Sequence, residues 1–335
     1  MDMRIANPRI GFLSAVSLVA LAGTAQAQTG PDLLLGQFGE GNNVVGRAEA
    51  IFLNSGNTEH DDVGGPGAQL QIYNASARFK LDLDNVIPGF SRTQPRAGIQ
   101  ATVLDFTTTD PSVPGTLADI SFGIGVGVAK TEKWVAGISV GVGFASNNVF
   151  NDANAVYGKA DLAFAYNINE REKIGIVLDY NGNRTFLPDV PLPGFIYTRK
   201  LSDDFTLEVG FPYSDVQWQP TDQLTLLLKF VFPDGGEARL DYKVSQSLGV
   251  FGALTQQYEA FQWNELDNPN RRVLFNQTRA ELGVRGTFMD NLSFVAAAGY
   301  AFNTELNVGW DSRDEDELAT LSDEPYVRFG VEVKF

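Results

Sequence analysis

The chain has 335 residues, no cysteine and a formal net charge of −16 at neutral pH. This charge argues against nucleic acid as a partner, because phosphate binding needs clustered Lys and Arg. The absence of cysteine excludes a disulfide framework and a cysteine-linked lipid anchor, so stability has to come from hydrogen bonding and packing.

The first residues have the features of a cleaved signal peptide. Arg4 and Arg9 give a basic start, residues 10–22 are apolar or small, and Ala25-Gln26-Ala27 fits the small-x-small cleavage pattern. An apolar stretch of about 13 residues is too short for a membrane helix, which needs roughly 20. We therefore expect a signal peptide that is removed on export (1–27), a periplasmic N-terminal segment (28–43) and one folded domain (44–335).

Apolar and polar residues alternate over many segments of the expected domain. Around residue 75, one face carries Tyr73, Ala75, Ala77 and Phe79 and the other carries Asn74, Ser76, Arg78 and Lys80. No segment of this domain supplies the 18 consecutive apolar residues of a membrane helix. Alternating segments of about ten residues are typical of a membrane barrel, whose outside meets lipid and whose inside meets water.

The segments 117–129 and 134–145 differ from the others because large apolar residues alternate with Gly and Ser. A wall of glycine then faces the lumen. Glycine here permits either curvature of the sheet or close packing of an inward loop. The alternative is clearance for a solute beside a charged opposite wall.

Short links alternate with longer ones along most of the chain, as the turns and loops of a barrel do. The longer links include 54–68 and 305–325. The fold class predicted is all-β, a transmembrane antiparallel β-barrel of sixteen strands, with fourteen or twelve as alternatives because Pro212 interrupts the short segments of 194–219. The strands are expected at 44–53, 69–82, 95–107, 117–129, 134–145, 156–168, 173–181, 194–201, 204–211, 213–219, 223–232, 236–244, 249–262, 275–287, 291–304 and 325–335.

A soluble β-sandwich also alternates apolar and polar residues. The barrel is favoured because Glu237, Arg239, Asp241 and Lys243 follow one another on one face. A wet lumen tolerates such a row better than a packed interior does. Aromatic residues near segment ends also fit the girdles of a membrane barrel; they are Trp134, Phe144, Trp218, Phe230, Phe232, Trp263, Phe288 and Trp310.

The polar faces, turned inward, give a lumen in which basic side chains outnumber acidic ones. Cross-strand ion pairs explain this as plain lining. A net positive passage would instead favour anionic solutes. The candidates for lumen lining are Arg47, Arg78, Lys80, Lys159, Arg239, Asp241, Lys243, Arg279, Glu281, Arg285 and Arg328.

The last ten residues carry the clearest alternation and end on an aromatic residue. Together with the signal peptide, they resemble Gram-negative outer-membrane β-barrel proteins, in which the last strand is read by the barrel-assembly machinery. That resemblance implies an assembly signal at Tyr326, Phe329, Val331, Val333 and Phe335. The stretches 192–197 and 210–218 further resemble a family of such barrels with no assigned function, and that resemblance carries over no functional residue.

Two groups of residues were weighed for chemistry. His60 has acidic neighbours, which favour a protonated imidazolium that is unsuited to act as a base. The acidic segment 311–317 lacks the glycine and the terminal acidic residue of a calcium loop, so it predicts a solvated loop, with cation bridging to lipopolysaccharide as a variant. We therefore expect no catalytic residue, no metal site and no cofactor.

These observations predict a non-enzymatic barrel in the Gram-negative outer membrane, in contact with its lipid and lipopolysaccharide. The leading hypothesis is a pore for small polar or anionic solutes. One alternative is a plugged structural barrel whose acidic extracellular loops form the working surface. A second is a carrier of hydrophobic small molecules, which needs an apolar inner pocket and a lateral opening. The oligomeric state is left open.

Overall fold

The computed structural model describes residues 43–60, 63–81, 95–148, 150–233, 235–266 and 268–335. Most of these residues lie in strands, and one short 3-10 helix, Ala153–Ala155, precedes β7. No helix in these ranges is long and apolar enough to cross a membrane. The strands are β1 (Val44–Leu53), β2 (Gly56–His60), β3 (Val63–Lys80), β4 (Arg96–Thr108), β5 (Thr116–Lys130), β6 (Trp134–Ser146), β7 (Val156–Asn169), β8 (Glu172–Asn181), β9 (Leu192–Lys200), β10 (Phe205–Phe211), β11 (Tyr213–Trp218), β12 (Leu224–Val231), β13 (Gly235–Lys243), β14 (Leu248–Phe261), β15 (Arg272–Met289), β16 (Leu292–Gly309), β17 (Asp316–Leu321) and β18 (Glu324–Lys334).

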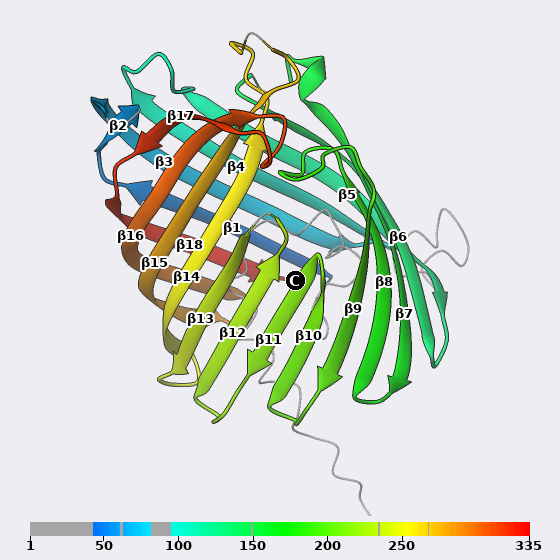
Figure 1. Ribbon diagram of the computed structural model, residues 1–335. Helices are drawn as coiled ribbons and strands as arrows, with labels where there is room; N and C mark the ends of the chain where they lie inside the picture. Colours follow the sequence, from blue (N-terminus) through cyan, green and yellow to red (C-terminus); the bar gives the residue numbers. More distant parts are fainter. Residues whose placement is uncertain (1–42, 61–62, 82–94, 149, 234, 267) are drawn as a thin grey trace, which may run out of the picture.

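Sixteen of these strands close into one antiparallel barrel, which confirms the predicted fold class and strand number. Neighbours along the chain pair from β3 to β16, and β18 then pairs with both β16 and β1. The ring closes where β1 pairs with β3, so the first and last strands lie side by side in the wall (Figure 1). Closure leaves no unpaired edge that another chain can extend.

The two remaining strands, β2 and β17, correct the sequence prediction. Residues 54–68 and 305–325 were expected to be loops, but β2 and β17 pair with each other there, and β3 and β16 extend into the same region. Gly64, Gly65, Pro66 and Gly67 explain the error, because glycine and proline are depleted in strands. Backbone pairing therefore continues beyond the barrel where the residue pattern alone indicates a turn.

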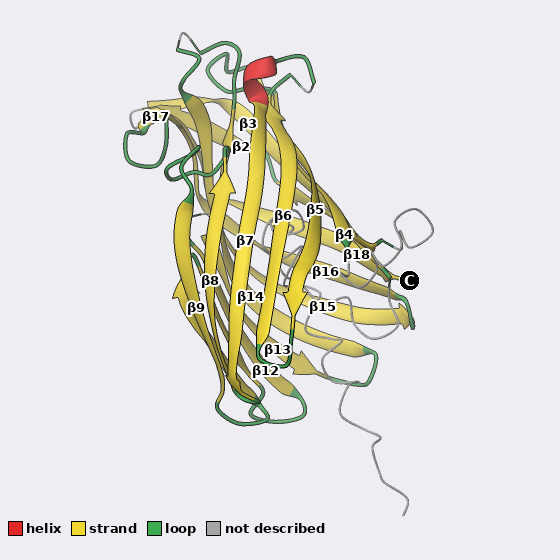
Figure 2. Cartoon of the chain, turned by 90° about the vertical axis from the view of Figure 1, so that its right-hand side faces the viewer, coloured by secondary structure: helices red, strands yellow, loops and turns green. Residues whose placement is uncertain are grey.

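The two ends of the barrel differ in their connections (Figure 2). At one end, tight turns join strands, such as residues 170–171 and 290–291, and the N–H of Asn43 donates to the carbonyl of Phe335. At the other end lie the longer connections 147–155, 182–191 and 262–271. Because membrane barrels have short periplasmic turns and longer extracellular loops, we assign the first end to the periplasm.

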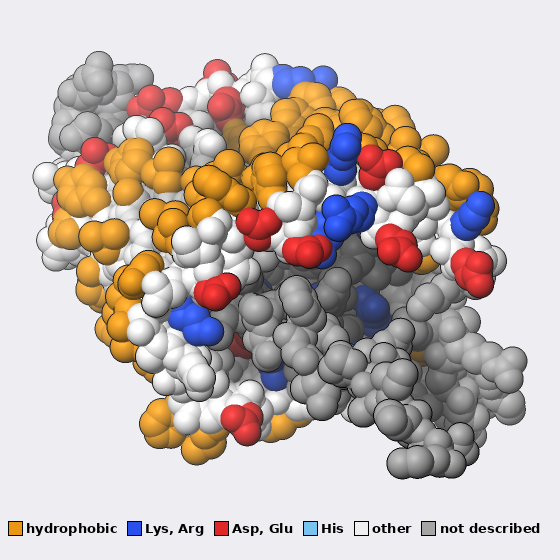
Figure 3. Space-filling model, turned by 90° about the horizontal axis from the view of Figure 1, so that it is seen from below, with side chains coloured by type: hydrophobic (Ala, Val, Ile, Leu, Met, Phe, Trp, Pro, Cys, Tyr) orange, Lys and Arg blue, Asp and Glu red, His pale blue; other side chains and the backbone are white. Residues whose placement is uncertain are grey.

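The outer wall is apolar, as a bilayer requires. Ile176 is 62% exposed, Leu282 is 74% exposed and Phe329 is 53% exposed, and all three point away from the lumen. Seen from the periplasmic end, hydrophobic side chains cover the wall, and charged side chains gather around the rim (Figure 3). This distribution supports an outer-membrane location for the barrel.

Apolar side chains fill one side of the extracellular half of the lumen. Ile72, Leu104, Phe275 and Leu306 come from four different strands, are fully buried and belong to one cluster. Sequence analysis did not foresee this cluster, because the same strand faces carry polar residues nearer the periplasm. Trp263, predicted to lie in an interfacial girdle, is also buried in it, which corrects that expectation.

A bridge between β6 and β14 divides the extracellular mouth in two. The N–H of Gln262 donates to the carbonyl of Ala145 (2.9 Å), and the N–H of Asn147 donates to the carbonyl of Gln262 (3.1 Å). These strands are not neighbours in the ring, so the bridge crosses the barrel. We call the side that contains the apolar cluster, from β14 through β18 and β1 to β6, the sealed lobe, and the side from β7 to β13 the roofed lobe.

The wall of the roofed lobe is low from β9 to β13. Strands β9 to β13 have 9, 7, 6, 8 and 9 residues, whereas β14, β15 and β16 have 14, 18 and 18. The extracellular connections are also short here, with Pro212 alone between β10 and β11 and residues 232–234 between β12 and β13. The extracellular rim therefore dips at β10 to β13, as Figure 1 shows. We call β9 to β13 the low wall.

Candidate functional site

The connection between β8 and β9, residues 182–191, folds inward over the roofed lobe, and we call it the roof. The side-chain amide of Asn183 donates to Asp119 Oδ2 (3.2 Å) on β5 and to the carbonyl of Ala260 (2.8 Å) on β14. Arg184 is 3% exposed and forms an ion pair of 2.6 Å with Asp179 on β8. The roof is thus fastened to three walls of the barrel, and it covers the lumen from the extracellular side.

Arg272, the first residue of β15, fastens the roof to a second loop. Its guanidinium donates to Asn183 Oδ1 (3.1 Å), to the carbonyl of Arg184 (3.0 Å) and to the carbonyl of Trp310 (2.7 Å). The side chain is 4% exposed. A hydrogen bond to a charged group contributes about 1.5–3 kcal/mol, so this one residue holds both loops strongly.

The second loop, residues 310–315, binds the roof through Asp311. This carboxylate accepts hydrogen bonds from the backbone N–H of Leu187 (3.0 Å) and from Nη2 of Arg313 (2.6 Å). Burial by itself would raise the pKa of Asp311, but these hydrogen bonds outweigh it and hold the pKa below its usual range. The segment 311–317 was predicted to be solvated, which is wrong for Asp311, because that residue is 1% exposed.

Aromatic rings join the roof to the top of the low wall. The ring of Phe186 in the roof lies 5.1 Å from the ring of Phe232, which lies 5.4 Å from the ring of Phe211. The guanidinium of Arg313 lies 5.3 Å from the ring of Phe186. We call Phe186, Phe211 and Phe232 the aromatic rim. It occupies the seam between a loop above the lumen and the lowest part of the wall.

Below the aromatic rim, the lumen carries a small apolar patch. Ala163, Val177 and Ile196 are buried neighbours on β7, β8 and β9, and Tyr213 at the start of β11 packs against them. All four share the inward face of their strands, since Ala163 pairs with Val177 and Ile196 pairs with the lumen-facing Gly210. An apolar surface therefore continues from the low rim into the lumen.

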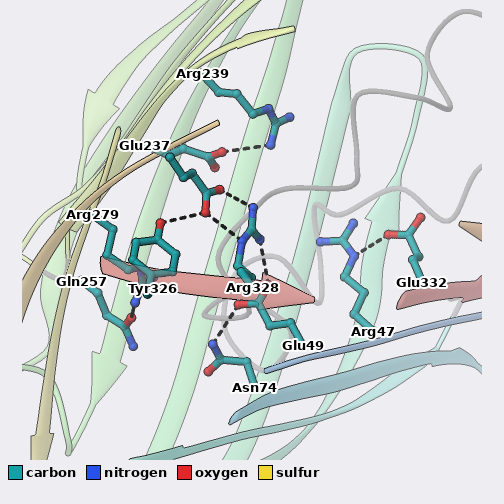
Figure 4. A network of polar contacts seen from close by, with 11 residues as sticks. Arg47, Glu49, Asn74, Glu237, Arg239, Gln257, Arg279, Tyr326, Arg328 and Glu332 are labelled. Atoms are coloured by element: carbon teal, nitrogen blue, oxygen red, sulfur yellow. Dashed lines mark hydrogen bonds and ion pairs between the residues drawn. The ribbon is translucent and has the colours of Figure 1, made fainter. Parts of the chain in front are cut away.

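The middle of the lumen holds a network of ion pairs, which Figure 4 shows from close by. Arg328 on β18 pairs with Glu49 on β1 (3.0 Å) and with Glu281 on β15. The hydroxyl of Tyr326 also donates to Glu281 (2.8 Å). These contacts join β18 to β1 and to β15, so Arg328 is matched by carboxylates from two other strands.

A second part of the network lies on β13 and β15. Arg239 pairs with Glu237 and with Asp241, each at 2.9 Å, and Arg285 pairs with the other oxygen of Asp241 at 2.6 Å. Arg239 is 1% exposed. The row at 237–241 was expected to line a wet lumen, but its three charged residues are buried in mutual contacts, which corrects that expectation. Ion pairing offsets the desolvation free energy that burial of these charges costs.

The predicted lumen residues are not equally buried. Lys80 at the periplasmic end of β3 is exposed, whereas Arg47, Lys159 and Lys243 are half-buried. Arg47 pairs with Glu332 at 2.5 Å. The buried members are Arg78, Arg239, Asp241, Arg279, Glu281, Arg285 and Arg328.

The glycine-rich hairpin of β5 and β6 accommodates a neighbouring ring. A Cβ on Gly143 would lie 2.0 Å from the ring of Tyr157, so the ring occupies the place of a side chain there. The hydroxyl of Tyr157 donates to Asp119 Oδ1 (2.6 Å), the same carboxylate that the roof contacts. At Gly143, close packing of a ring from the neighbouring strand β7 therefore explains the glycine, whereas the sequence predicted curvature of the sheet or an inward loop.

The residues implied in assembly split between the two faces of β18. Phe329, Val331 and Phe335 are exposed on the outer wall, at 53%, 50% and 60%. Val333 is half-buried, and Tyr326 is 3% exposed because it faces the lumen. An outward aromatic row at the last strand is available to a partner in the membrane, and its role in assembly stays a prediction.

The other candidates for chemistry are quickly placed. His60 ends β2, and its side chain lies outside the described part of the structure, as do residues 1–27 and 28–42 of the expected N-terminal segments. Among the described residues, no three or more His, Cys, Asp or Glu side chains are grouped as they would be to hold a metal ion.

Sequence reasoning missed the roof and its fasteners. Asn183, Arg184 and Arg272 had not been singled out, because no periodicity marks a loop residue that docks on strands about 80 positions away. The only local signal is Asn181-Gly182-Asn183, which indicates a turn. A turn signal does not say onto which wall the loop folds.

No family model and no curated protein matches the chain, so the finer resemblance to a barrel family gains no support. Solved structures that are similar include the toluene transporter TodX of Pseudomonas putida, with 10% identity over 93% of this chain and 95% of that one and a TM-score of 0.37. Another is an outer-membrane channel of Pseudomonas putida, with 10% identity over 88% of this chain and 96% of that one and a TM-score of 0.39. A third is a FadL homologue of Pseudomonas aeruginosa, with 10% identity over 88% of this chain and 91% of that one and a TM-score of 0.40. At these values the likenesses assign no substrate to this chain.

Proposed function

We propose that this barrel is a non-enzymatic channel that passes small apolar molecules between the outer leaflet of the membrane and its lumen, across the low wall. The observation that carries this proposal is the dip of the rim at β10 to β12, whose strands have 7, 6 and 8 residues. A strand that spans the hydrocarbon core needs about 9–11 residues. The lipid-facing wall is therefore incomplete in this sector, directly below the roof.

The chemistry around the dip fits an apolar solute. The aromatic rim lines the seam, and the inward patch of Ala163, Val177 and Ile196 continues it into the lumen. An apolar molecule that moves from lipid to this patch stays out of water, which favours the sideways route by about 25 cal/mol for each Å² kept dry. The apolar patch and the low sector of the wall support the second sequence alternative, which requires an apolar inner pocket and a lateral opening.

The other two hypotheses fit the structure less well. An aqueous pore for anions needs positive charges that face water, but Arg239 and Arg328 bind Glu49, Glu237, Asp241 and Glu281. A permanently plugged barrel needs no dip in its wall, and a uniform wall would hide more backbone from lipid. The roofed lobe is closed by one loop, whereas the sealed lobe is filled by side chains.

Cross-linking the roof to the low wall tests the proposal. The chain has no cysteine, so Phe186→Cys with Phe232→Cys offers two unique sites for a short bis-maleimide linker. We expect cross-linking to lower the uptake of labelled toluene by intact cells that express the barrel, by about tenfold. The matched control is Asn148→Cys with Asn264→Cys, which links two exposed residues beside the bridge between β6 and β14.

The control is expected to take up toluene at the unmodified rate, because backbone hydrogen bonds already hold these two segments together. Equal uptake by the linked and unlinked Phe186→Cys and Phe232→Cys barrel would contradict passage through the seam. Loss of uptake in both linked variants would instead show that apolar solutes enter through the mouth as a whole.

A further inference from the structure

Two cationic side chains flank a lumen-facing glycine near the periplasmic end of the barrel. In the strand register, Lys243 on β13 is opposite Gly249 on β14, and Gly249 is opposite Arg285 on β15. Neighbouring strands lie about 4.8 Å apart, so the two cationic residues are separated by about 10 Å of wall. Because Gly249 has no side chain, the wall itself places no side chain between them. A Cβ placed on Gly249 would lie 3.8 Å from Arg285 Nε.

Arg285 has donors that the barrel leaves unused. Its Nη2 pairs with Asp241 Oδ1, but Nε and Nη1 have no hydrogen-bond partner in the described part of the chain, although the residue is 5% exposed. A buried donor without a partner costs about 1–3 kcal/mol. Nη2, which is part of both two-donor edges of the guanidinium, is taken by Asp241, so Nε and Nη1 can each donate to one oxygen of an anion.

The charged side chains around Gly249 sum to one net positive charge. Glu237 and Asp241 are matched by Arg239 and Arg285, so these four side chains cancel formally. Lys243 is half-buried, and no carboxylate of the described residues lies within ion-pair distance of it. The site over Gly249 therefore retains one uncompensated positive charge beside the unpartnered Nε of Arg285.

Apolar side chains lie directly beside Gly249 and Arg285. Val295 is opposite Arg285 in the register, Phe251 follows Gly249 by two residues on the same face, and Ala297 packs with both. They are 6%, 4% and 8% exposed. A ligand that places an anionic group over Gly249 can therefore rest an apolar body on the cluster of Phe251, Val295 and Ala297.

We propose that the lumen binds small organic monocarboxylates over Gly249, with the carboxylate between Arg285 and Lys243 and the apolar body on Phe251 and Val295. This inference rests on the proposed function and narrows it, because it names amphipathic acids as the molecules that the apolar route delivers. Nε of Arg285 donates to one carboxylate oxygen, and Lys243 donates to the other and supplies the second positive charge. Asp241 keeps the guanidinium in place, with Nε toward Gly249.

Binding of benzoate and of methyl benzoate to the folded barrel in detergent tests this site, with isothermal titration calorimetry at neutral pH. We expect the wild type to bind benzoate more tightly than the ester. Arg285→Gln should weaken benzoate binding by about tenfold or more, and Lys243→Gln by a smaller factor, because the first removes a buried charged donor and the second a half-buried one. The affinity for the ester should not change in either variant.

Two further variants keep the test decisive. Arg285→Lys retains the charge beside Asp241 but not the Nε–H donor, so we expect intermediate binding from a folded barrel, checked by its heat-dependent gel mobility. Arg47→Gln removes a lumen arginine that pairs with Glu332 and should bind benzoate as the wild type does.

The outcomes separate the two proposals. Equal affinity of the wild type for benzoate and its ester, or unchanged benzoate binding in Arg285→Gln, would overturn the site even if cells take up toluene through the low wall. If benzoate binds as expected but the cross-linking experiment shows no passage at the seam, the lateral route is wrong and the carboxylate site stands.

Discussion

The sealed lobe and the roofed lobe close the same mouth by different means. In the sealed lobe, apolar side chains from opposite walls pack against one another, and Phe261 and Phe275 are fully buried. In the roofed lobe, one loop is held by polar contacts that converge on Arg272 and Asp311. Apolar packing is lost only when a whole wall moves, whereas a loop held by hydrogen bonds can exchange them for water. The comparison identifies the roof as the part that can open.

The largest expected difference concerns stability. Phe275→Ala in the sealed lobe should lower the free energy of unfolding by about 3–5 kcal/mol, because it removes a fully buried ring. Phe186→Ala in the roof should lower it by about 1 kcal/mol or less, since its ring contacts only loop and rim residues. Urea unfolding in lipid vesicles measures both, and equal losses would remove the distinction between the lobes.

The second difference is in loop docking. Arg272→Gln should weaken the docking of the roof by about 2–3 kcal/mol, because a charged donor shared by two loops is lost. Arg184 is 3% exposed in the docked roof, so trypsin should cleave after it much faster in the variant than in the wild type. Arg271→Gln, at the neighbouring exposed ion pair with Asp316, is the matched control. Cleavage at equal rates in all three proteins would show that Arg272 does not hold the roof.

A smaller effect is expected from pH. The hydrogen bonds from Arg313 and Leu187 lower the pKa of Asp311 in the docked roof, although burial opposes them. A lowered pKa means that the contribution to docking is complete above the ordinary carboxyl value of about 3.9 and is lost as pH falls through the lower, docked value. Hydrogen exchange at the Leu187 amide should therefore accelerate below about pH 4, after correction for its intrinsic rate. Asp311→Asn should exchange faster throughout and show no such step.

The smallest effect on either lobe is expected at the C-terminus. Deleting Phe335 removes an outward ring that is 60% exposed and touches neither the roof nor the apolar cluster. We expect several-fold less assembled barrel in the membrane, with the roof equally protected from trypsin in the molecules that do assemble. Normal amounts of assembled protein would count against the role in assembly that the resemblance implies.

The strands were predictable from the sequence because alternation reports directly on the two solvents of a barrel wall. Even the short segments around Pro212 fall where the pattern places them, in β10 and β11. β2 and β17 were missed because their pairing lies above the membrane, where no apolar face is required. The pattern therefore finds strands that face lipid, and it is silent about pairing in the extracellular loops.

The site was less predictable, because it depends on where polar faces change character along a strand. Leu70 and Ile72 share the inward face of β3 with Asn74 and Ser76, so one strand contributes both to the apolar cluster and to the polar lumen. Alternation assigns a side to each residue, but it does not say what lies across the barrel. The charged residues were correctly grouped by chemistry, but their pairing partners come from strands that only the closed ring brings together.

Photolabelling with an apolar diazirine probe dissolved in the bilayer tests the lateral route most directly. Outward residues are labelled in any membrane barrel, so the informative residues are those that face the lumen. We predict labelling of Val177 and Ile196 in the roofed lobe, and none of Leu104 and Phe275 in the sealed lobe, when the labelled peptides are mapped by mass spectrometry. Labelling confined to the outer wall, or equal in the inward residues of both lobes, would contradict passage across the low wall.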